Sequence, residues 1–160
     1  MAVRKKKPAT KKRMGRKIVQ SKKVTLDGIT FASTLESVMY KLLKEAGIKF
    51  TYEGESYQTF EPLVLEEECW ERATKRSKAM IDRRKVTKVS YTPDFIGENE
   101  EFFIEVKGRA NESFPIRWKL FKNLVAKREK PPIIFKPMNK ADCEQVIEIL
   151  KQKGYARRKG

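Results

Sequence analysis

A chain of 160 residues is long enough to bury one hydrophobic core and too short for two ordinary domains, so we expect one folded domain with tails. No run of apolar residues approaches the length of a membrane span, and the initial stretch MAVRKKKPATKKRMGRK lacks the apolar segment of a signal peptide. The sequence therefore favours a soluble, cytoplasmic protein over a membrane-spanning or secreted one.

The net charge of +16 comes from the two ends of the chain. Residues 1–23 contain eleven Lys and Arg and no acid, residues 151–160 contain five and no acid, and residues 24–150 contain 21 basic and 21 acidic residues. We predict a disordered basic arm over 1–23, a domain over 24–154 and a basic tail over 155–160, because such ends cannot bury enough apolar surface to fold alone. The arm suits binding to nucleic acid, and it equally suits a solubilising tail or a nuclear localisation signal.

The first predicted helix begins at Ser33 and ends at Ala46. Its apolar residues follow the spacing of one helical face: Leu35, Val38, Met39, Leu42, Leu43 and Ala46. Ser33 and Glu36 have the spacing of a capping box. Residues 48–65 are rich in β-branched and aromatic side chains, which predicts strand with a turn or bulge near Gly54.

A charged insertion occupies residues 61–88. It passes from an acidic run to a basic one, with eight basic residues and one acid between Arg72 and Lys88, and we predict that residues 66–85 are partly helical. The remaining predicted elements are two strands joined by a turn, a helix, a short buried strand and a terminal helix, at 86–96, 101–108, 114–129, 132–138 and 140–154. This order predicts an α/β fold with a mixed central β-sheet and helices on its faces.

Missing residue types exclude several chemistries. The chain has no histidine, which removes a histidine general base and histidine-ligated metal sites. Cys69 and Cys143 stand alone without CxxC spacing, so we expect two reduced, buried, structural cysteines and no zinc site. No GxxxxGK[ST] or GxGxxG string is present, so no nucleotide cofactor is expected.

Three charged residues in the predicted strand pair have the chemistry of a metal-dependent phosphodiesterase. Glu105 and Lys107 are two residues apart on one strand and therefore project to the same face. Asp94 follows Pro93, which cannot donate to a sheet ladder and indicates that the preceding strand bends there, so that the carboxylate leans toward Glu105. Clustered carboxylates hold Mg²⁺, with Mn²⁺ as an alternative, and a nearby cation positions the attacking water.

The same residues carry a family resemblance. The string YTPDF at 91–95 followed by FFIEVKG at 102–108 resembles the signature of the PD-(D/E)xK nuclease superfamily, with Asp94 in the PD and Glu105 and Lys107 in the ExK. The upstream segment 31–53 is similar to the first helix and strand of phage Holliday-junction resolvases of the endonuclease I type. The strings DGITF, YTPDF and EVKG also resemble those of a group of short phage proteins. The resemblance covers roughly residues 27–135.

This resemblance implies a restriction-endonuclease-like core and a phage-encoded, Mg²⁺-dependent endonuclease that cuts branched DNA. It implies that Asp94, Glu105 and the carbonyl of Val106 bind metal, that Glu36 completes the metal site, and that Lys107 orients the attacking water. A homodimer is expected, because a junction has two symmetric cleavage points. The insertion at 61–88 departs from the resolvases, which puts the choice of substrate in question.

Basic residues of the predicted domain are expected to bind DNA phosphates. They are Arg83, Arg84 and Lys85 of the insertion and Arg117, Lys119 and Lys122, which we expect to share one face of the second helix.

Each candidate catalytic residue also has a purely structural interpretation. Glu105 and Lys107 would be an exposed ion pair, Asp94 a turn residue, and Glu36 only the capping-box glutamate. Two other functions fit the same pattern: a non-enzymatic nucleic-acid-binding or packaging protein on a nuclease-like fold, and a sequence-specific nicking or restriction-type nuclease.

Overall fold

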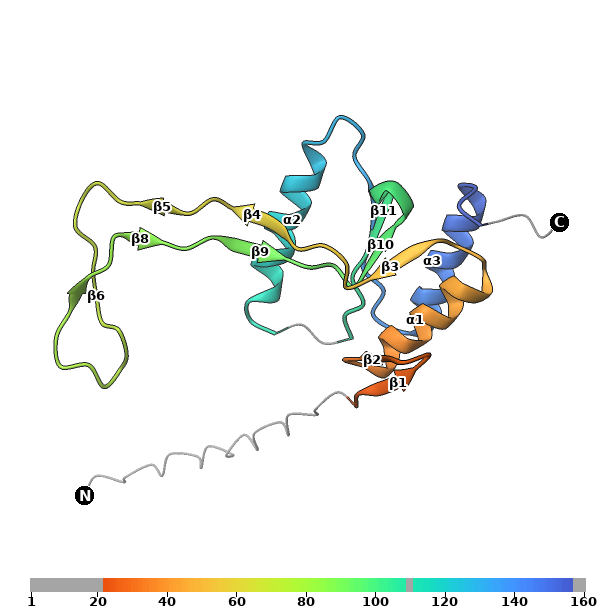
Figure 1. Ribbon diagram of the computed structural model, residues 1–160, viewed down its shortest axis with the longest axis horizontal. Helices are drawn as coiled ribbons and strands as arrows, with labels where there is room; N and C mark the ends of the chain where they lie inside the picture. The colour runs from red at the N-terminus through yellow and green to blue at the C-terminus, as the bar shows by residue number, and fades with distance from the viewer. Residues whose placement is uncertain (1–21, 109–110, 157–160) are drawn as a thin grey trace, which may run out of the picture.

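The computed structural model describes residues 22–108 and 111–156. The predicted basic arm up to residue 21 and the tail from residue 157 lie outside the described residues. The described chain is a mixed α/β structure with three α-helices, a four-stranded sheet and four two-stranded sheets, which confirms the predicted fold class (Figure 1). Within this part of the chain, no helix has the length and apolar composition that crossing a membrane requires.

The central sheet has the strand order β12-β11-β10-β3. Strand β12 runs parallel to β11, and the other pairs are antiparallel, so the sheet is mixed, as predicted. These strands are β3 (Phe50–Tyr52), β10 (Phe95–Gly97), β11 (Phe102–Ile104) and β12 (Ile133–Phe135). The hairpin between β10 and β11 turns through a short 3-10 helix, Glu98–Glu100, as the predicted turn required.

Side chains of β10 and β11 alternate between two hydrophobic layers. Phe95 and Ile104 face the layer formed with α1 (Thr34–Glu45) and α3 (Lys140–Gln152), whereas Ile96 and Phe103 face the layer formed with α2 (Phe114–Ala126). Figure 1 shows α2 on one side of the sheet and the α1–α3 pair on the other. Because successive residues of a strand point to opposite faces, this alternation also fixes the face on which the residues just beyond each strand lie.

The helix ends follow the sequence signals closely. The Ser33 side chain accepts a hydrogen bond from the backbone N–H of Glu36, so the predicted N-cap is confirmed. The Glu36 carboxylate accepts from the Ala32 N–H and the Ser33 hydroxyl, in place of the Ser33 N–H of a regular capping box. Helix α3 is capped in the same way by Asn139, whose side chain accepts from the N–H of Asp142. Helix α2 begins differently: Ser113 is at the N-cap position without a side-chain cap, and the Asn111 side chain accepts from the N–H of Phe114.

An antiparallel hairpin precedes α1 and has no counterpart in the predicted elements. Strands β1 (Val24–Leu26) and β2 (Ile29–Phe31) pair around Asp27 and Gly28, both of which have positive φ. An Asp-Gly pair between two short alternating runs is a strong signal for such a two-residue turn. The hairpin contributes Phe31 to the core beside α1.

Residues 57–91 form a long two-stranded ribbon that projects from the central sheet, away from α1 and α3 (Figure 1). The predicted helical character of residues 66–85 is therefore wrong. The charged sequence lacks the apolar stripe that would pack a helix onto the core, and its short apolar pairs instead match across two antiparallel strands. The ribbon consists of β4 (Tyr57–Phe60) with β9 (Val89–Tyr91), β5 (Leu63–Val64) with β8 (Lys85–Val86), and β6 (Trp70–Glu71) with β7 (Ile81–Asp82).

Two smaller expectations also need correction. Cys143 is buried and free, as expected, but Cys69 lies half-exposed on the ribbon, because no core forms around this segment. The β12 strand is only half-buried, because it is at the edge of the central sheet.

Candidate active site

Asp94 lies where the chain leaves the ribbon and enters the central sheet. Strand β9 ends at Tyr91, Pro93 is fully buried, and β10 starts at Phe95, so the predicted break in the strand is confirmed. Phe95 pairs with Ile104, which places Asp94 across the hairpin from Glu105. One carboxylate oxygen of Asp94 accepts a hydrogen bond from the backbone N–H of Val106 at 2.7 Å.

Glu105 and Lys107 continue the alternation of β11 beyond its end, on the face toward α2. Glu105 is only 5% exposed, and the Lys107 Nζ lies 3.8 Å from its Oε1 atom. The Lys107 ammonium also lies 4.9 Å from the centre of the Phe114 ring at the start of α2. An exposed surface ion pair does not describe this arrangement, because the carboxylate has been removed from water.

Glu36 approaches from the opposite side of the sheet, at the N-terminus of α1. Its side chain is buried and accepts hydrogen bonds from the Ser33 hydroxyl at 2.7 Å, the Ala32 N–H at 3.1 Å and the Tyr52 hydroxyl at 2.8 Å. Within the described chain, Glu36 and Glu105 are the only charged residues in the buried class. Glu36 therefore has a full capping role and also lies among the candidate site residues.

The pKa values of Asp94 and Glu105 are both raised in this cluster. Burial raises the pKa of Asp94 to about 8, and the charges of Glu105 and Glu36 add to this effect, whereas the Val106 N–H and Lys107 oppose it. Burial also raises the pKa of Glu105, with a further contribution from Glu36, while the Tyr91 hydroxyl and Lys107 act in the opposite direction. One ammonium group is thus the main positive charge beside three acidic side chains.

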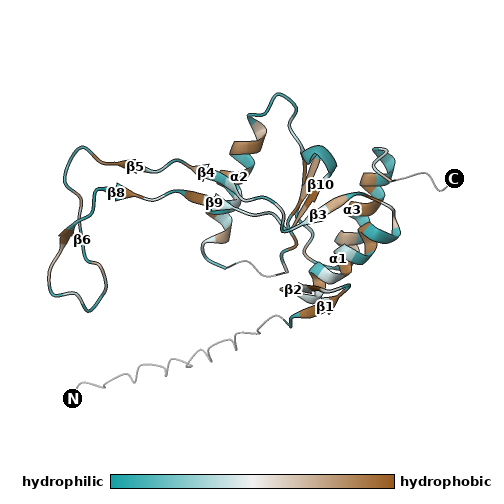
Figure 2. Cartoon of the chain, in the orientation of Figure 1, coloured by the Kyte–Doolittle hydropathy of each residue, from teal (hydrophilic) through white to brown (hydrophobic). Residues whose placement is uncertain are grey.

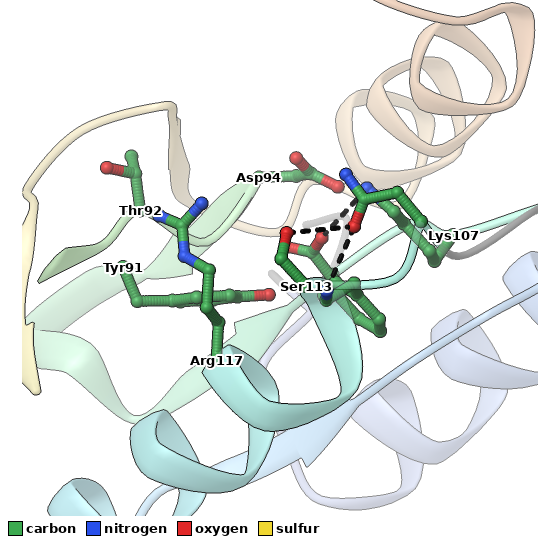
Figure 3. A pocket seen from close by; sticks show the side chains of 9 residues that line it. Tyr91, Thr92, Asp94, Lys107, Ser113 and Arg117 are labelled. Carbon is green, nitrogen blue, oxygen red and sulfur yellow. Dashed lines mark hydrogen bonds and ion pairs between the residues drawn. The ribbon is translucent and has the colours of Figure 1, made fainter. Parts of the chain in front are cut away.

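A pocket of about 230 Å³ opens between this cluster and the first turns of α2 (Figure 3). It is lined by Tyr91, Thr92, Asp94, Glu105, Lys107, Asn111, Ser113, Phe114 and Arg117. The Arg117 guanidinium donates to the carbonyl of Ser90 at 2.7 Å and thereby stays at the rim. The pocket combines two acidic and two basic side chains, a composition that suits a phosphate group together with a cation.

The Tyr91 hydroxyl is a further polar group of this pocket. The Tyr91 side chain is 5% exposed, and its buried hydroxyl lies near the Glu105 carboxylate but makes no hydrogen bond of ordinary length and angle with it or with any other described residue. In Figure 3 the hydroxyl points into the pocket. A buried hydroxyl without a partner costs free energy, which a hydrogen bond to a bound ligand would recover. The sequence offered no signal for this role, because an aromatic residue such as Tyr91 is common in β-strands for packing alone.

The described residues do not contain three His, Cys, Asp or Glu side chains already converged on one metal-sized point. Two local contacts account for this. The oxygens of Glu36 face its own helix cap and Tyr52, and one oxygen of Asp94 faces the Val106 N–H. The predicted ligand set is therefore gathered into one neighbourhood, with Glu36 turned toward its capping partners.

The predicted DNA-binding residues fall into three separate places. Arg117 is at the pocket, but Lys119 and Lys122 are not among its lining residues. At about 100° per residue they lie on the opposite side of α2 from Arg117, so the expectation of one shared face is wrong. Arg83, Arg84 and Lys85 are on the ribbon, where Arg84 pairs with Asp82 at 2.7 Å.

Comparison with known protein families identifies one match. Residues 16–134 match the family described as "Protein of unknown function (DUF1064)", and because this is about three quarters of the chain, the chain belongs to that family. The matched region contains the ribbon and all candidate site residues, and it ends before α3. Neither the curated proteins nor the solved structures gave a significant match.

Proposed function

We propose that this member of the DUF1064 family is a metal-dependent DNA endonuclease of the PD-(D/E)xK type, with a restriction-endonuclease-like core. The observation that carries the proposal is that the buried Glu36 and Glu105 and the half-buried Asp94 lie in one neighbourhood, with Lys107 as their nearby cation. Burying like charges together is costly, and a fold that needed only structure would place apolar residues there. A divalent cation would neutralise the cluster, and it prefers these oxygen ligands.

The side chains present fit such an ion. Asp94 and Glu105 would hold it, with the carbonyl of Val106 as a further ligand and Glu36 as the third carboxylate. A bound Mg²⁺ supplies positive charge that activates water and stabilises the charge that develops on the attacked phosphate. The raised pKa values of Asp94 and Glu105 would fall when the positive charge arrives, because an opposite charge favours the ionised form.

The chain's own residues hold the phosphate and the attacking water in this proposal. The Lys107 ammonium donates to the water and turns it toward phosphorus, since it is beside Glu105 at the floor of the pocket. Arg117 at the rim donates to the phosphate oxygens, and the unpartnered Tyr91 hydroxyl donates to the same group from below.

The substrate of this proposal is DNA with a branch or other distortion. Of the six candidate phosphate-binding residues, only Arg117 lines the pocket. Lys119 and Lys122 are elsewhere on α2, and Arg83, Arg84 and Lys85 are on the ribbon. Such scattered charge supplies affinity for phosphates at several points without reading base edges. The description as a junction-cutting enzyme rests on the resemblance of the sequence to the phage resolvases.

The test is cleavage of a matched set of labelled DNA molecules by the purified full-length protein. Linear duplex, nicked, flapped and four-way DNA of the same sequence would each be incubated with Mg²⁺ or with EDTA. We expect Mg²⁺-dependent cuts near the branch, in junctions of unrelated sequence. Absence of metal-dependent cleavage of every DNA form contradicts the proposal, and cuts that follow one sequence motif contradict the substrate assignment.

A further inference from the structure

The ribbon displays most of the large apolar side chains that the described chain leaves exposed. Nine large hydrophobic residues are exposed in all, and seven of them are on the ribbon: Phe60, Leu63, Val64, Leu65, Trp70, Met80 and Ile81. Val64 is 69% exposed, the largest value of the set. Figure 2 shows this hydrophobic character along β5 and β6. Exposed apolar residues concentrated on one element are typical of a surface that another molecule covers.

No described element of the same chain covers the outer part of the ribbon. The root, formed by β4 and β9, packs on α2, whereas β5 with β8 and β6 with β7 make their main contacts only with each other. A two-stranded ribbon has unpaired backbone groups along both edges and is at best marginally stable alone in water. The outer ribbon therefore lacks the packing that would stabilise it in a single chain.

The charges of the ribbon distinguish between two molecules that could cover its apolar surface, DNA and a second protein. Residues 57–71 carry five acids and no base, and residues 72–88 carry eight bases and one acid. DNA is a poor match for this surface, because the acidic strand would repel its phosphates and the apolar residues would face a charged backbone. Protein surfaces that contact DNA are polar and positively charged. A second protein surface with both signs of charge and matching apolar residues avoids both penalties.

We propose that the occupant is a second copy of this chain, and that two ribbons pack side by side in antiparallel directions. A two-fold axis near the exposed apolar residues at the middle of the ribbon, Leu63 to Leu65, would bury this surface on both copies at once. The antiparallel direction keeps the two tip loops, residues 72–80, at opposite ends. Each tip loop has four basic residues and no acid, so a parallel pair would repel itself.

The antiparallel arrangement has a consequence for the pocket. The root of the ribbon, at Tyr91, leads directly into Asp94, so the tip loop of one copy comes to lie near the pocket of the other. Its basic residues, Arg72, Lys75, Arg76 and Lys78, would hold DNA beside the cut made by the partner. This role of the tip loop rests on the proposed nuclease function, whereas the association through the ribbon does not.

The association is tested by measuring the mass of the full-length protein in solution by light scattering. We expect twice the mass of one chain, and half of that value for a Leu63→Ser, Val64→Ser double variant. A matched control double variant is Ile116→Ser, Met138→Ser, which removes the two exposed large hydrophobic residues outside the ribbon and should leave the mass unchanged. Circular dichroism would establish that each variant is folded.

Crosslinking provides a second measurement that does not depend on the apolar variants. In a Cys69→Ser background, one chain would carry Lys75→Cys at the tip and another Lys88→Cys near the root. A short bismaleimide should join the two different chains when they are mixed, and should join each chain to itself far less. A monomeric wild type at tens of micromolar, or a ribbon variant that stays dimeric, overturns the proposal. A wild type that stays monomeric, with the Lys75→Cys thiol protected from maleimide labelling by added DNA, would instead identify DNA as the occupant.

Complementation then tests the action of the tip loop on the partner's pocket. One chain would carry Glu105→Gln, and the other would carry Gln at all four basic tip positions. Mixed dimers should cut DNA faster than either chain alone, because one intact pocket meets one intact tip loop from the other copy. No gain on mixing overturns the action in trans. If wild type cuts no DNA, the nuclease function fails while the mass and crosslinking results still decide the association.

Discussion

The backbone N–H of Val106 donates a 2.7 Å hydrogen bond to the carboxylate of Asp94, across the hairpin from Glu105. This bond ties Asp94 to the same strand end that presents Glu105 and Lys107 to the pocket. It offsets only part of the penalty of burial, since the pKa of Asp94 is still raised to about 8. In the proposed function, this bond holds the carboxylate in place for a bound cation, at the expense of the stability of the free protein.

Asp94→Asn should therefore stabilise the metal-free protein, and more so at higher pH. The folded-state pKa of Asp94 is raised from 3.8 to about 8, so the folded state binds the proton more tightly than the unfolded state. Stability is then lost as the pH rises from about 4 to about 8. Asn keeps the acceptor for Val106 without the charge, and its melting temperature should exceed that of wild type by at least several degrees at pH 8 in EDTA.

Thermal unfolding at pH 5 and pH 8 checks this expectation. The advantage of Asp94→Asn should shrink at pH 5, where the wild-type carboxyl is mostly protonated. Added Mg²⁺ should raise the melting temperature of wild type and leave that of the variant nearly unchanged. A variant that is less stable than wild type at pH 8 would mean that Asp94 is a structural residue.

Glu36→Gln separates the capping role of this residue from a role in the site. Gln keeps an acceptor oxygen for its capping partners, so the free energy of unfolding should change by about 1 kcal/mol or less. Cleavage should fall by roughly 10- to 100-fold, the usual effect of losing a residue that supports a metal site. Ser33→Ala is the matched control: it removes the cap and should cost about 1 kcal/mol of stability with little loss of cleavage. Equal cleavage rates for Glu36→Gln and wild type would show that Glu36 serves only as a helix cap.

The sequence predicted the centre of the molecule better than its periphery. Asp94, Glu105 and Lys107 come together because strand periodicity and the buried Pro93 act locally, within one hairpin. The strands at the root of the ribbon fall within the predicted strand segments 48–65 and 86–96. The ribbon as a paired unit was missed, because the pairing of its short apolar segments depends on contacts between strands far apart in the chain, such as Leu63 with Val86. The pocket roles of Tyr91 and Arg117 depend on how α2 packs on the sheet, which no local pattern encodes.

Deletion of residues 2–23 should weaken DNA binding and flatten its dependence on salt. The deleted segment contains eleven basic residues. Each DNA phosphate that a basic residue neutralises releases counterions from the DNA, and this release makes the binding constant depend more steeply on salt. If the arm neutralises about six phosphates, the slope of log K against log salt should become less negative by roughly five. Fluorescence anisotropy of labelled DNA, titrated at several salt concentrations between about 50 and 200 mM, measures this slope. An unchanged slope would assign the arm to another partner.

The most direct test of the central claim is single-turnover cleavage of a labelled four-way junction by wild type, Asp94→Asn and Glu105→Gln in Mg²⁺. Loss of several kcal/mol of transition-state stabilisation lowers the rate by on the order of 100-fold or more. We predict a loss of this size for both variants, with DNA affinity in EDTA equal to or tighter than that of wild type, because each removes negative charge from the pocket. Cleavage by both variants at the wild-type rate would contradict the assignment of this pocket as the active site.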